Sequence, residues 1–138
     1  MAALGLGTLG LGACSSDKGV TKAEFLRRAN SSCTHPPKES KAVRRALSNA
    51  VTPEQKAKLY REKVLPRAEQ VLDEIAKLEP PKADRERVKR FIATARREAR
   101  SFADVLKSDP RAALALSSQL FAKSSAAANQ YGLEICVY

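Results

Sequence analysis

Prolines divide this chain into short segments, and their positions constrain its fold more than any other feature. Pro36-Pro37 and Pro80-Pro81 each interrupt a segment with helical periodicity, whereas Pro53 and Pro110 each follow a residue suited to cap a helix. Proline is tolerated in the first turn of a helix but disrupts its interior, because it lacks an N–H and its ring crowds a preceding carbonyl. The chain is therefore expected to form several helices joined by proline-containing turns.

Between these prolines, apolar residues recur at the three- and four-residue spacing of amphipathic helices, and no segment alternates as a strand does. The predicted fold is a single all-α bundle spanning residues 21–138. Its main helices are expected at about 21–34, 53–79, 82–107 and 110–131, with a short basic helix at about 39–50. Pro66 predicts a kink within 53–79. The basic helix is expected to pack on the domain, with a place on a membrane surface as the alternative. The Ala- and Ser-rich last helix is expected to be the most buried.

Polar residues and one glycine mark several helix ends. Thr21 with Glu24, and Thr52 with Gln55, have the spacing of capping boxes. Gly132 stands where a helix C-cap requires the left-handed conformation.

The N-terminal stretch ends in Leu11-Gly12-Ala13-Cys14, which has the pattern of a lipobox. Residues 1–13 are apolar and uncharged but too few to span a bilayer as a helix, which takes about 20 residues. We expect them to be part of a lipoprotein signal peptide whose positive leader and true start lie upstream. Cys14 would then carry the lipid and residues 14–20 would form a tether. This predicts a location at the extracytoplasmic face of the cell membrane; the alternative is an apolar N-terminus with a chance cysteine.

The cysteine count agrees with this interpretation. The chain has three cysteines, and lipidation of Cys14 leaves Cys33 and Cys136 as an even pair in an oxidising compartment. A Cys33–Cys136 disulfide is therefore expected, and it would bring the first helix and the C-terminal tail into contact. Two free buried thiols, or one reactive cysteine, are the alternatives.

Several short motifs occur in a familiar order. They are the lipobox, Thr21-Lys22-Ala23-Glu24-Phe25 before Cys33, Val64-Leu65-Pro66, Leu78-Glu79-Pro80-Pro81, and Tyr131-Gly132-Leu133 before Cys136. In these motifs the chain resembles small secreted lipoproteins of actinobacteria (mycobacterial and streptomycete-like sequences), whose function is largely unknown. The resemblance implies a secreted helical domain with one disulfide, and it brings no catalytic residues.

Basic residues are concentrated in one predicted helix. The net charge is +10, and residues 82–100 contain eight basic and three acidic side chains. Arg85, Lys89, Arg96 and Arg100 fall together beside the apolar seam of this helix. They form a candidate contact with an anionic lipid or an anionic wall polymer; the alternative is a solvated helix face.

The sequence shows no catalytic or metal-binding constellation. His35 is the single histidine, and structural zinc needs about four ligands. Glu69, Asp73 and Lys77 stand four residues apart, a spacing typical of ion pairs on one helix surface. No enzyme activity, cofactor or metal is therefore expected.

The function predicted from the sequence is that of a non-catalytic binding or structural module of the cell envelope, without nucleic acid as a partner and with no protein partner identified. Two alternatives stay open. One is a small carrier that holds an apolar ligand in its helical core. The other is a cytoplasmic basic helical protein that binds nucleic acid, which requires the lipobox to be false.

Overall fold

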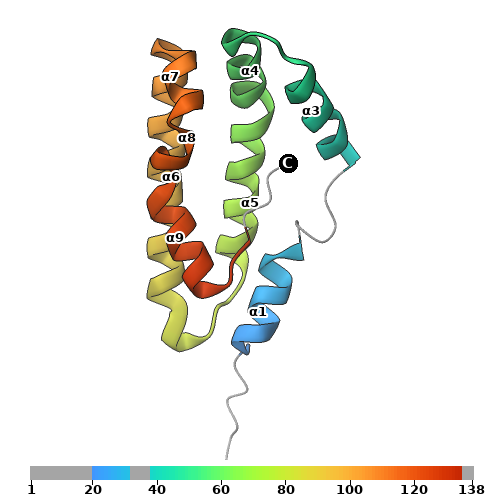
Figure 1. Ribbon diagram of the computed structural model, residues 1–138. Coiled ribbons are helices and arrows are strands. Elements are labelled where there is room, and N and C mark those ends of the chain that lie inside the picture. Colours follow the sequence, from blue (N-terminus) through green and yellow to red (C-terminus); the bar gives the residue numbers. More distant parts are fainter. Residues whose placement is uncertain (1–19, 32–37, 135–138) are drawn as a thin grey trace, which may run out of the picture.

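The computed structural model describes residues 20–31 and 38–134, and every regular element within these ranges is helical, without strands. The all-α prediction is confirmed. Three rods make up the bundle (Figure 1). The first is α4 (Pro53–Leu59), the π-helical turn η1 (Tyr60–Val64) and α5 (Leu65–Lys77); the second is the 3₁₀ turn η2 (Lys82–Asp84) and α6 (Arg85–Ser108); the third is α7 (Pro110–Ala115), α8 (Ser117–Leu120) and α9 (Ala122–Tyr131).

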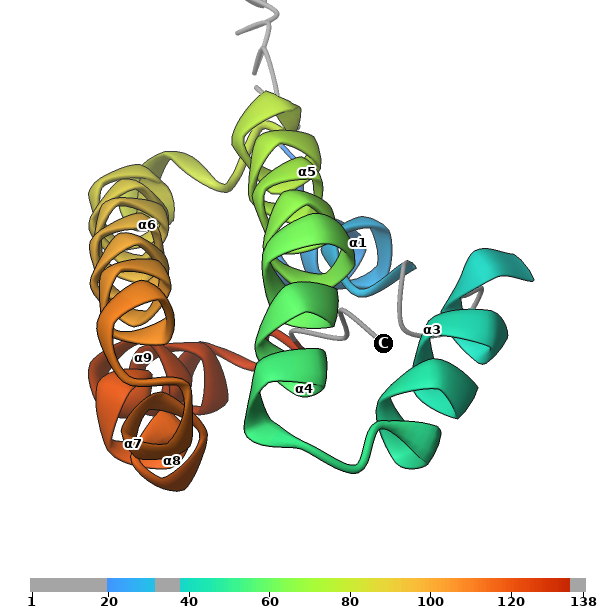
Figure 2. The same ribbon diagram turned by 90° about the horizontal axis from the view of Figure 1, so that it is seen from above.

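Two further helices lie against the first rod. The helix α1 (Lys22–Ala29) packs at the end where α5 turns into α6, and α3 (Lys38–Asn49) flanks α4. Seen from above, the α4–α5 rod stands between α6 and α9 on one side and α1 and α3 on the other (Figure 2). Val43 and Ser40 are the buried residues of α3, so the basic helix packs on the domain as expected.

Helix starts follow the capping chemistry of the sequence. Thr52 and Gln55 form the complete capping box at the start of α4. At α1 the Thr21 hydroxyl accepts the N–H of Glu24 at 3.2 Å. The Glu24 carboxylate accepts hydrogen bonds from Arg27 and from the next arginine of the same helix, and these bonds lower its pKa to about 2.

Pro66 is accommodated by the π-helical turn that precedes it. The N–H of Leu65 donates to the carbonyl of Tyr60, five residues earlier. This wider turn lets the rod continue into α5 with Pro66 in its first turn, where proline is tolerated. The disturbance expected at Pro66 is present, in the form of a π-helical segment.

The predictions for the last helix were wrong in two respects. The rod is broken at Leu116 and Phe121, whose backbones leave the helical region, and it is not the most buried part of the bundle. Leu116 is 48% exposed, and only three of the eleven alanines and serines in this rod are buried, namely Ala113, Ser124 and Ala128. Short side chains have little apolar area to bury. The rod contacts α6 along its length, and α7 also contacts α4. The central helix α6 contains more buried residues.

The interior consists of two apolar clusters rather than one continuous core. The large core lies at the α1 end and contains Phe25, Ala29, Val71, Leu72, Ile75, Val88, Phe91, Ile92, Ala95, Ala128, Tyr131 and Leu133. The small core lies at the α7 end and contains Ala57, Phe102, Leu106 and Ala113, with partly buried aromatic and aliphatic residues around them.

The chain after α9 returns to α1. Gly132 adopts the left-handed conformation (φ +94°), and the N–H groups of Gly132 and Leu133 both donate to the carbonyl of Ala128 at 2.9 Å, as predicted for this C-cap. Asn30 ends α1 earlier than position 34. Its side chain donates to the Gly132 carbonyl and accepts from the N–H of Glu134, both at 3.0 Å. The predicted contact between the first helix and the C-terminal tail is confirmed.

Candidate functional site

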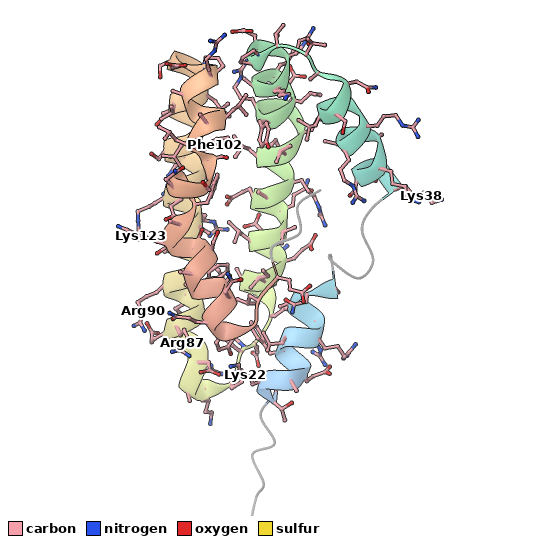
Figure 3. The ribbon with its side chains drawn as sticks, in the orientation of Figure 1. Lys22, Lys38, Arg87, Arg90, Phe102 and Lys123 are labelled. Atoms are coloured by element: carbon pink, nitrogen blue, oxygen red, sulfur yellow. The ribbon has the colours of Figure 1, made fainter. Side chains whose placement is uncertain are left out.

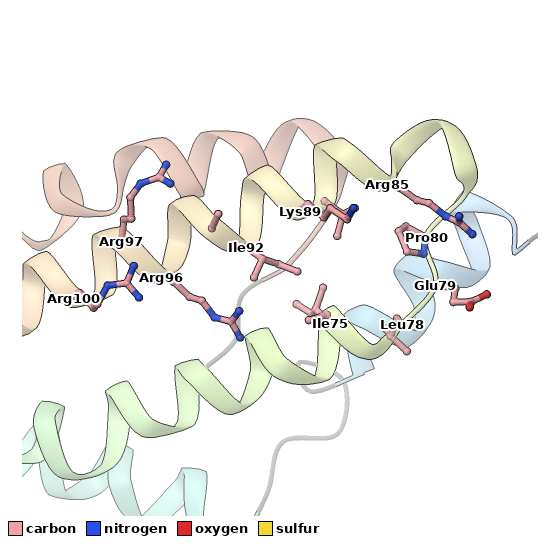
Figure 4. Close-up of a pocket in the computed structure, with 13 residues that line it drawn as sticks. Ile75, Leu78, Glu79, Pro80, Arg85, Lys89, Ile92, Arg96, Arg97 and Arg100 are labelled. Atoms are coloured by element: carbon pink, nitrogen blue, oxygen red, sulfur yellow. The ribbon is translucent and has the colours of Figure 1, made fainter.

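The four cations proposed from the sequence line a single groove. Arg85, Lys89, Arg96 and Arg100 border a depression of about 640 Å³ between α6 and the C-terminal end of α5 (Figure 4). They share this border because positions four and seven residues apart fall on one face of α6. The helix geometry therefore gathers residues that are spread over sixteen positions of sequence into one site.

The floor of the groove is apolar. Ile75 from α5 and Val88 and Ile92 from α6 form it, and each is nearly fully buried as part of the large core. Leu78 and Pro80 extend the apolar surface into the turn between the two helices. A ligand in this groove would meet hydrocarbon below and positive charge around the rim.

Arg96 is already paired within the protein. Its guanidinium donates from Nε to Glu69 at 2.7 Å and from Nη2 to Asp73, so it joins α6 to α5. The expected four-residue ion pairs along α5 are replaced by this bridge between helices. Arg96 thus contributes to the shape of the groove, while its charge is largely balanced by two carboxylates.

The remaining cations of the rim keep most of their charge available. Among the described residues, Arg85 and Arg100 have no ion-pair partner. Lys89 contacts the exposed Glu86 at 3.1 Å, an arrangement worth only a few tenths of a kcal/mol (about 0.3–0.5). Glu79 is the one carboxylate that lines the groove.

Arg97 also lines the groove, although it was not among the four cations predicted from the sequence. Its Nη2 donates to Thr94 Oγ1 at 3.0 Å, one turn earlier on α6. The groove extends over Ala93, whose small side chain leaves the α6 surface open on that side. A long arginine side chain can therefore reach a border that its Cα position does not predict.

A hydrogen bond between the C-terminal end of α9 and the turn before α6 fixes the start of α6 and with it the end of the groove. The Tyr131 hydroxyl donates to Asp84 Oδ2 at 2.8 Å. Burial of the ring, followed by this hydrogen bond, raises the pKa of Tyr131 to about 12. The ring also packs edge-on against Phe25, while Lys22 and Arg87 lie over it at 4.4 and 5.9 Å from its centre.

These cations belong to one end of the molecule. Figure 3 shows Lys22, Arg87 and Arg90 at the end of the bundle where α1 begins and where α5 turns into α6. Lys38 lies on the far side, at the start of α3. Arg85, at the start of α6, lies at this end, and the groove runs from there along α6 to Arg100.

The other sites proposed from the sequence fall elsewhere. Cys14, Cys33, His35 and Cys136 all lie outside the described residues. Within residues 20–31 and 38–134, no group of acidic, histidine or cysteine side chains could hold a metal ion. In the same ranges no helix combines the length and hydrophobicity needed to cross a membrane. Comparisons of the chain with family models, with curated proteins and with solved structures find no match.

Proposed function

We propose that this protein is a lipid-anchored, non-catalytic module at the extracytoplasmic face of the cell membrane, which binds anionic phosphate groups in the groove between α5 and α6. The observation that carries the proposal is the meeting of Arg85, Lys89, Arg97 and Arg100 around an apolar floor. The shared chemistry of the ligand is a phosphodiester, which occurs in anionic lipid headgroups and in anionic wall polymers. Lipid headgroups are the preferred source.

The position of the tether supports that preference. Val20 packs against the large core, and Lys22 and Arg87 both lie over the ring of Tyr131. Residues 15–19 can span no more than about 20 Å when fully extended. A lipid on Cys14 would therefore hold this end of the bundle, with the basic groove, close to the headgroups.

The Asn30 contacts support the Cys33–Cys136 disulfide as part of the same proposal. Asn30 bonds to Gly132 and Glu134 at 3.0 Å, and the two cysteines follow three residues after Asn30 and two residues after Glu134. At 3.3–3.6 Å per residue, the Cα of Cys33 can be no more than about 11 Å from that of Asn30, and the Cα of Cys136 can be no farther than this from that of Glu134. The Cα separation of about 4.4–6.8 Å that a disulfide needs is within reach.

The membrane anchor and the disulfide have direct tests. Metabolic labelling with a lipid precursor, applied to the protein with its full upstream sequence, should label the wild type and leave Cys14→Ala unlabelled. Alkylation of the secreted protein without reduction should leave Cys33 and Cys136 unmodified. An unlabelled wild type removes the anchor from the proposal, and alkylation of both cysteines removes the disulfide.

Vesicle binding tests the groove itself. The full chain carrying Cys14→Ser, which cannot be lipidated, is mixed at about 0.1 M salt, where the Debye length is about 10 Å, with vesicles containing phosphatidylglycerol or with vesicles of phosphatidylcholine alone. Neutralising Arg85, Lys89, Arg97 and Arg100 together to glutamine should remove about 1 kcal/mol for each charge near the surface. The loss of about 4 kcal/mol corresponds to roughly a 10³-fold weaker binding to the anionic vesicles.

A matched variant separates the groove from net charge. Replacing Lys38, Lys41, Arg44 and Arg45 of α3 by glutamine also removes four exposed positive charges, but far from the groove. Its binding should fall less than about tenfold, because charges beyond a Debye length from the bound surface contribute little. If the two variants lose equal affinity for the anionic vesicles, the groove acts only through its share of the net charge. Stronger competition by soluble poly(glycerol phosphate) than by vesicles would identify the wall polymer as the source.

A further inference from the structure

A second cavity lies between the rods of the bundle, at the junction of the large core and the small core. It has a volume of about 250 Å³, is bordered by η1 and α5, by α6, and by the start of α9, and opens to solvent on one side, where Ser125 is exposed. The residues that line it are Tyr60, Val64, Leu65, Ala68, Leu72, Ala95, Ala99, Phe102, Phe121, Ser124 and Ser125. None of them carries a charge, in contrast to the basic groove.

Small side chains at the centre of three rods create this space. Ala68 from α5, Ala99 from α6 and Ser125 from α9 contribute walls of one or two heavy atoms each. Bulky residues from neighbouring turns surround them, with Leu72 at one end and Phe102 at the other. The two cores therefore meet without filling the space between them, which is the arrangement that leaves an apolar interior open.

Two backbone irregularities lie at the same level as the cavity. The π-helical turn Tyr60–Val64 supplies two of its lining residues, and the interruption at Phe121 supplies a third. A π-helical segment widens the helix and costs regular hydrogen bonding, and such segments occur frequently at functional sites. The irregular turns thus surround the space that a regular helix pair would close.

The walls favour an apolar ligand, preferably an aromatic one. Tyr60 and Phe102 meet edge to face with ring centres 5.5 Å apart, and Phe102 and Phe121 lie 5.2 Å apart. Phe102 lies between α6 and the α4–η1–α5 rod (Figure 3). The Ser124 hydroxyl already donates to the carbonyl of Phe121 at 3.3 Å, and its N–H donates to Glu98. Few polar groups are left to bind a charged or strongly polar molecule.

We infer that this cavity binds a small neutral apolar molecule. Apolar cavities of about 150 Å³ hold benzene, which is about 25 Å³ for each of its six carbons, so the space of about 250 Å³ here takes roughly ten such atoms. The site is independent of the basic groove, and the failure of either leaves the other unchanged.

Titration with toluene, followed by the ¹³C-methyl NMR signals of the full chain, tests the inference. Toluene should shift the methyl signals of Val64, Leu65 and Leu72 in a saturable way, and it should leave those of Ile75 and Ile92 in the basic groove unchanged. Shifts that grow linearly and equally in both sets would mean nonspecific partitioning and would overturn the site.

A second experiment tests the inference by filling the cavity with a larger side chain. Ala99→Leu adds three heavy atoms, about a third of the space, and should weaken toluene binding at least tenfold. The same substitution at Ala93, which lines the other groove and is exposed, should leave binding within twofold of the wild type. Ala68→Leu repeats the filling from the opposite wall, in case one variant folds poorly. Wild-type affinity in a folded Ala99→Leu or Ala68→Leu protein would refute the assignment.

Discussion

Glu98 should contribute to the free energy of unfolding through a contact that the residues near it in the sequence do not reveal. Its two carboxylate oxygens accept the N–H groups of Lys123 at 3.1 Å and Ser124 at 3.0 Å, which are the second and third residues of α9. The residue preceding α9 is Phe121, which has no side-chain acceptor and caps nothing. Glu98 of α6 therefore serves as the N-cap of a helix that begins 24 residues later.

Glu98→Ala removes this cap and leaves two helix N–H groups without their acceptor. Loss of an N-cap costs about 0.5–2 kcal/mol, and loss of a carboxylate at the positive end of a helix dipole costs about 0.3–1 kcal/mol more. We expect the free energy of unfolding to fall by about 2 kcal/mol. For a domain of this size that lowers Tm by about 8 °C, at roughly 4 °C per kcal/mol.

Thermal and urea unfolding followed by circular dichroism measure this loss, and amide exchange of Lys123 and Ser124 locates it. Glu98→Gln keeps one acceptor and should lose about half as much. Glu86→Ala removes an exposed glutamate from the same helix and should cost less than about 0.5 kcal/mol. If Glu98→Ala melts within 2 °C of the wild type, or no lower than Glu86→Ala, the capping argument is wrong.

Three other substitutions test separate parts of the fold. Gly132→Ala places a side chain at φ +94° with its Cβ 3.1 Å from Leu26 Cδ1, and urea unfolding should show a loss of about 1–2 kcal/mol. The raised pKa of Tyr131 means that its neutral form is the one favoured by folding, so stability should be full below pH 10 and decline as the pH rises toward 12. Tyr131→Phe should lack this part of the alkaline decline in the urea midpoint, and an unchanged decline would contradict the raised pKa of Tyr131. Phe102→Ala empties the small core, where Phe102 is 1% exposed, and should cost about 3–5 kcal/mol by the same assay.

Much of the fold follows from local chemistry. Prolines and caps located the start of α4 at Thr52 and of α7 at Asp109, whose carboxylate accepts the N–H of Ala112 at 2.9 Å. Gly132 marked the end of α9 because few other residues adopt its conformation. These features depend on residues three or four positions apart, so one sequence is enough to identify them.

The interruptions of the third rod depend on distant residues. Nothing near Phe121 signals a break, since the cap of α9 comes from Glu98 and the surrounding contacts come from α6 and η1. Tertiary contacts of this kind override the helix propensity of an Ala- and Ser-rich segment. The position of the apolar cavity could not be predicted for the same reason, because it arises where small residues of three rods coincide.

The candidate groove was partly predictable. Helical periodicity placed Arg85, Lys89 and Arg100 on one face, but it could not reveal that Arg96 would bond to Glu69 on α5. Nor could it show that Arg97 reaches the same border. Pairing between helices depends on the axial register of α5 and α6, and the spacing within either helix does not fix that register.

The hydrogen bonds that Asn30 makes with Gly132 and Glu134 have a mechanical consequence. In a protein attached at Cys14, as proposed, any pull between membrane and bundle enters the fold through α1. That helix is short, and its far end is held by hydrogen bonds from Asn30 to residues 102 and 104 positions away. Force would thus pass from the start of the chain to its last described residues through Asn30, and to the long rods through the packing of Phe25 and Ala29 in the large core. Detachment of α1 and fraying of the tail should therefore occur as a single event, at a lower force than unfolding of the three rods.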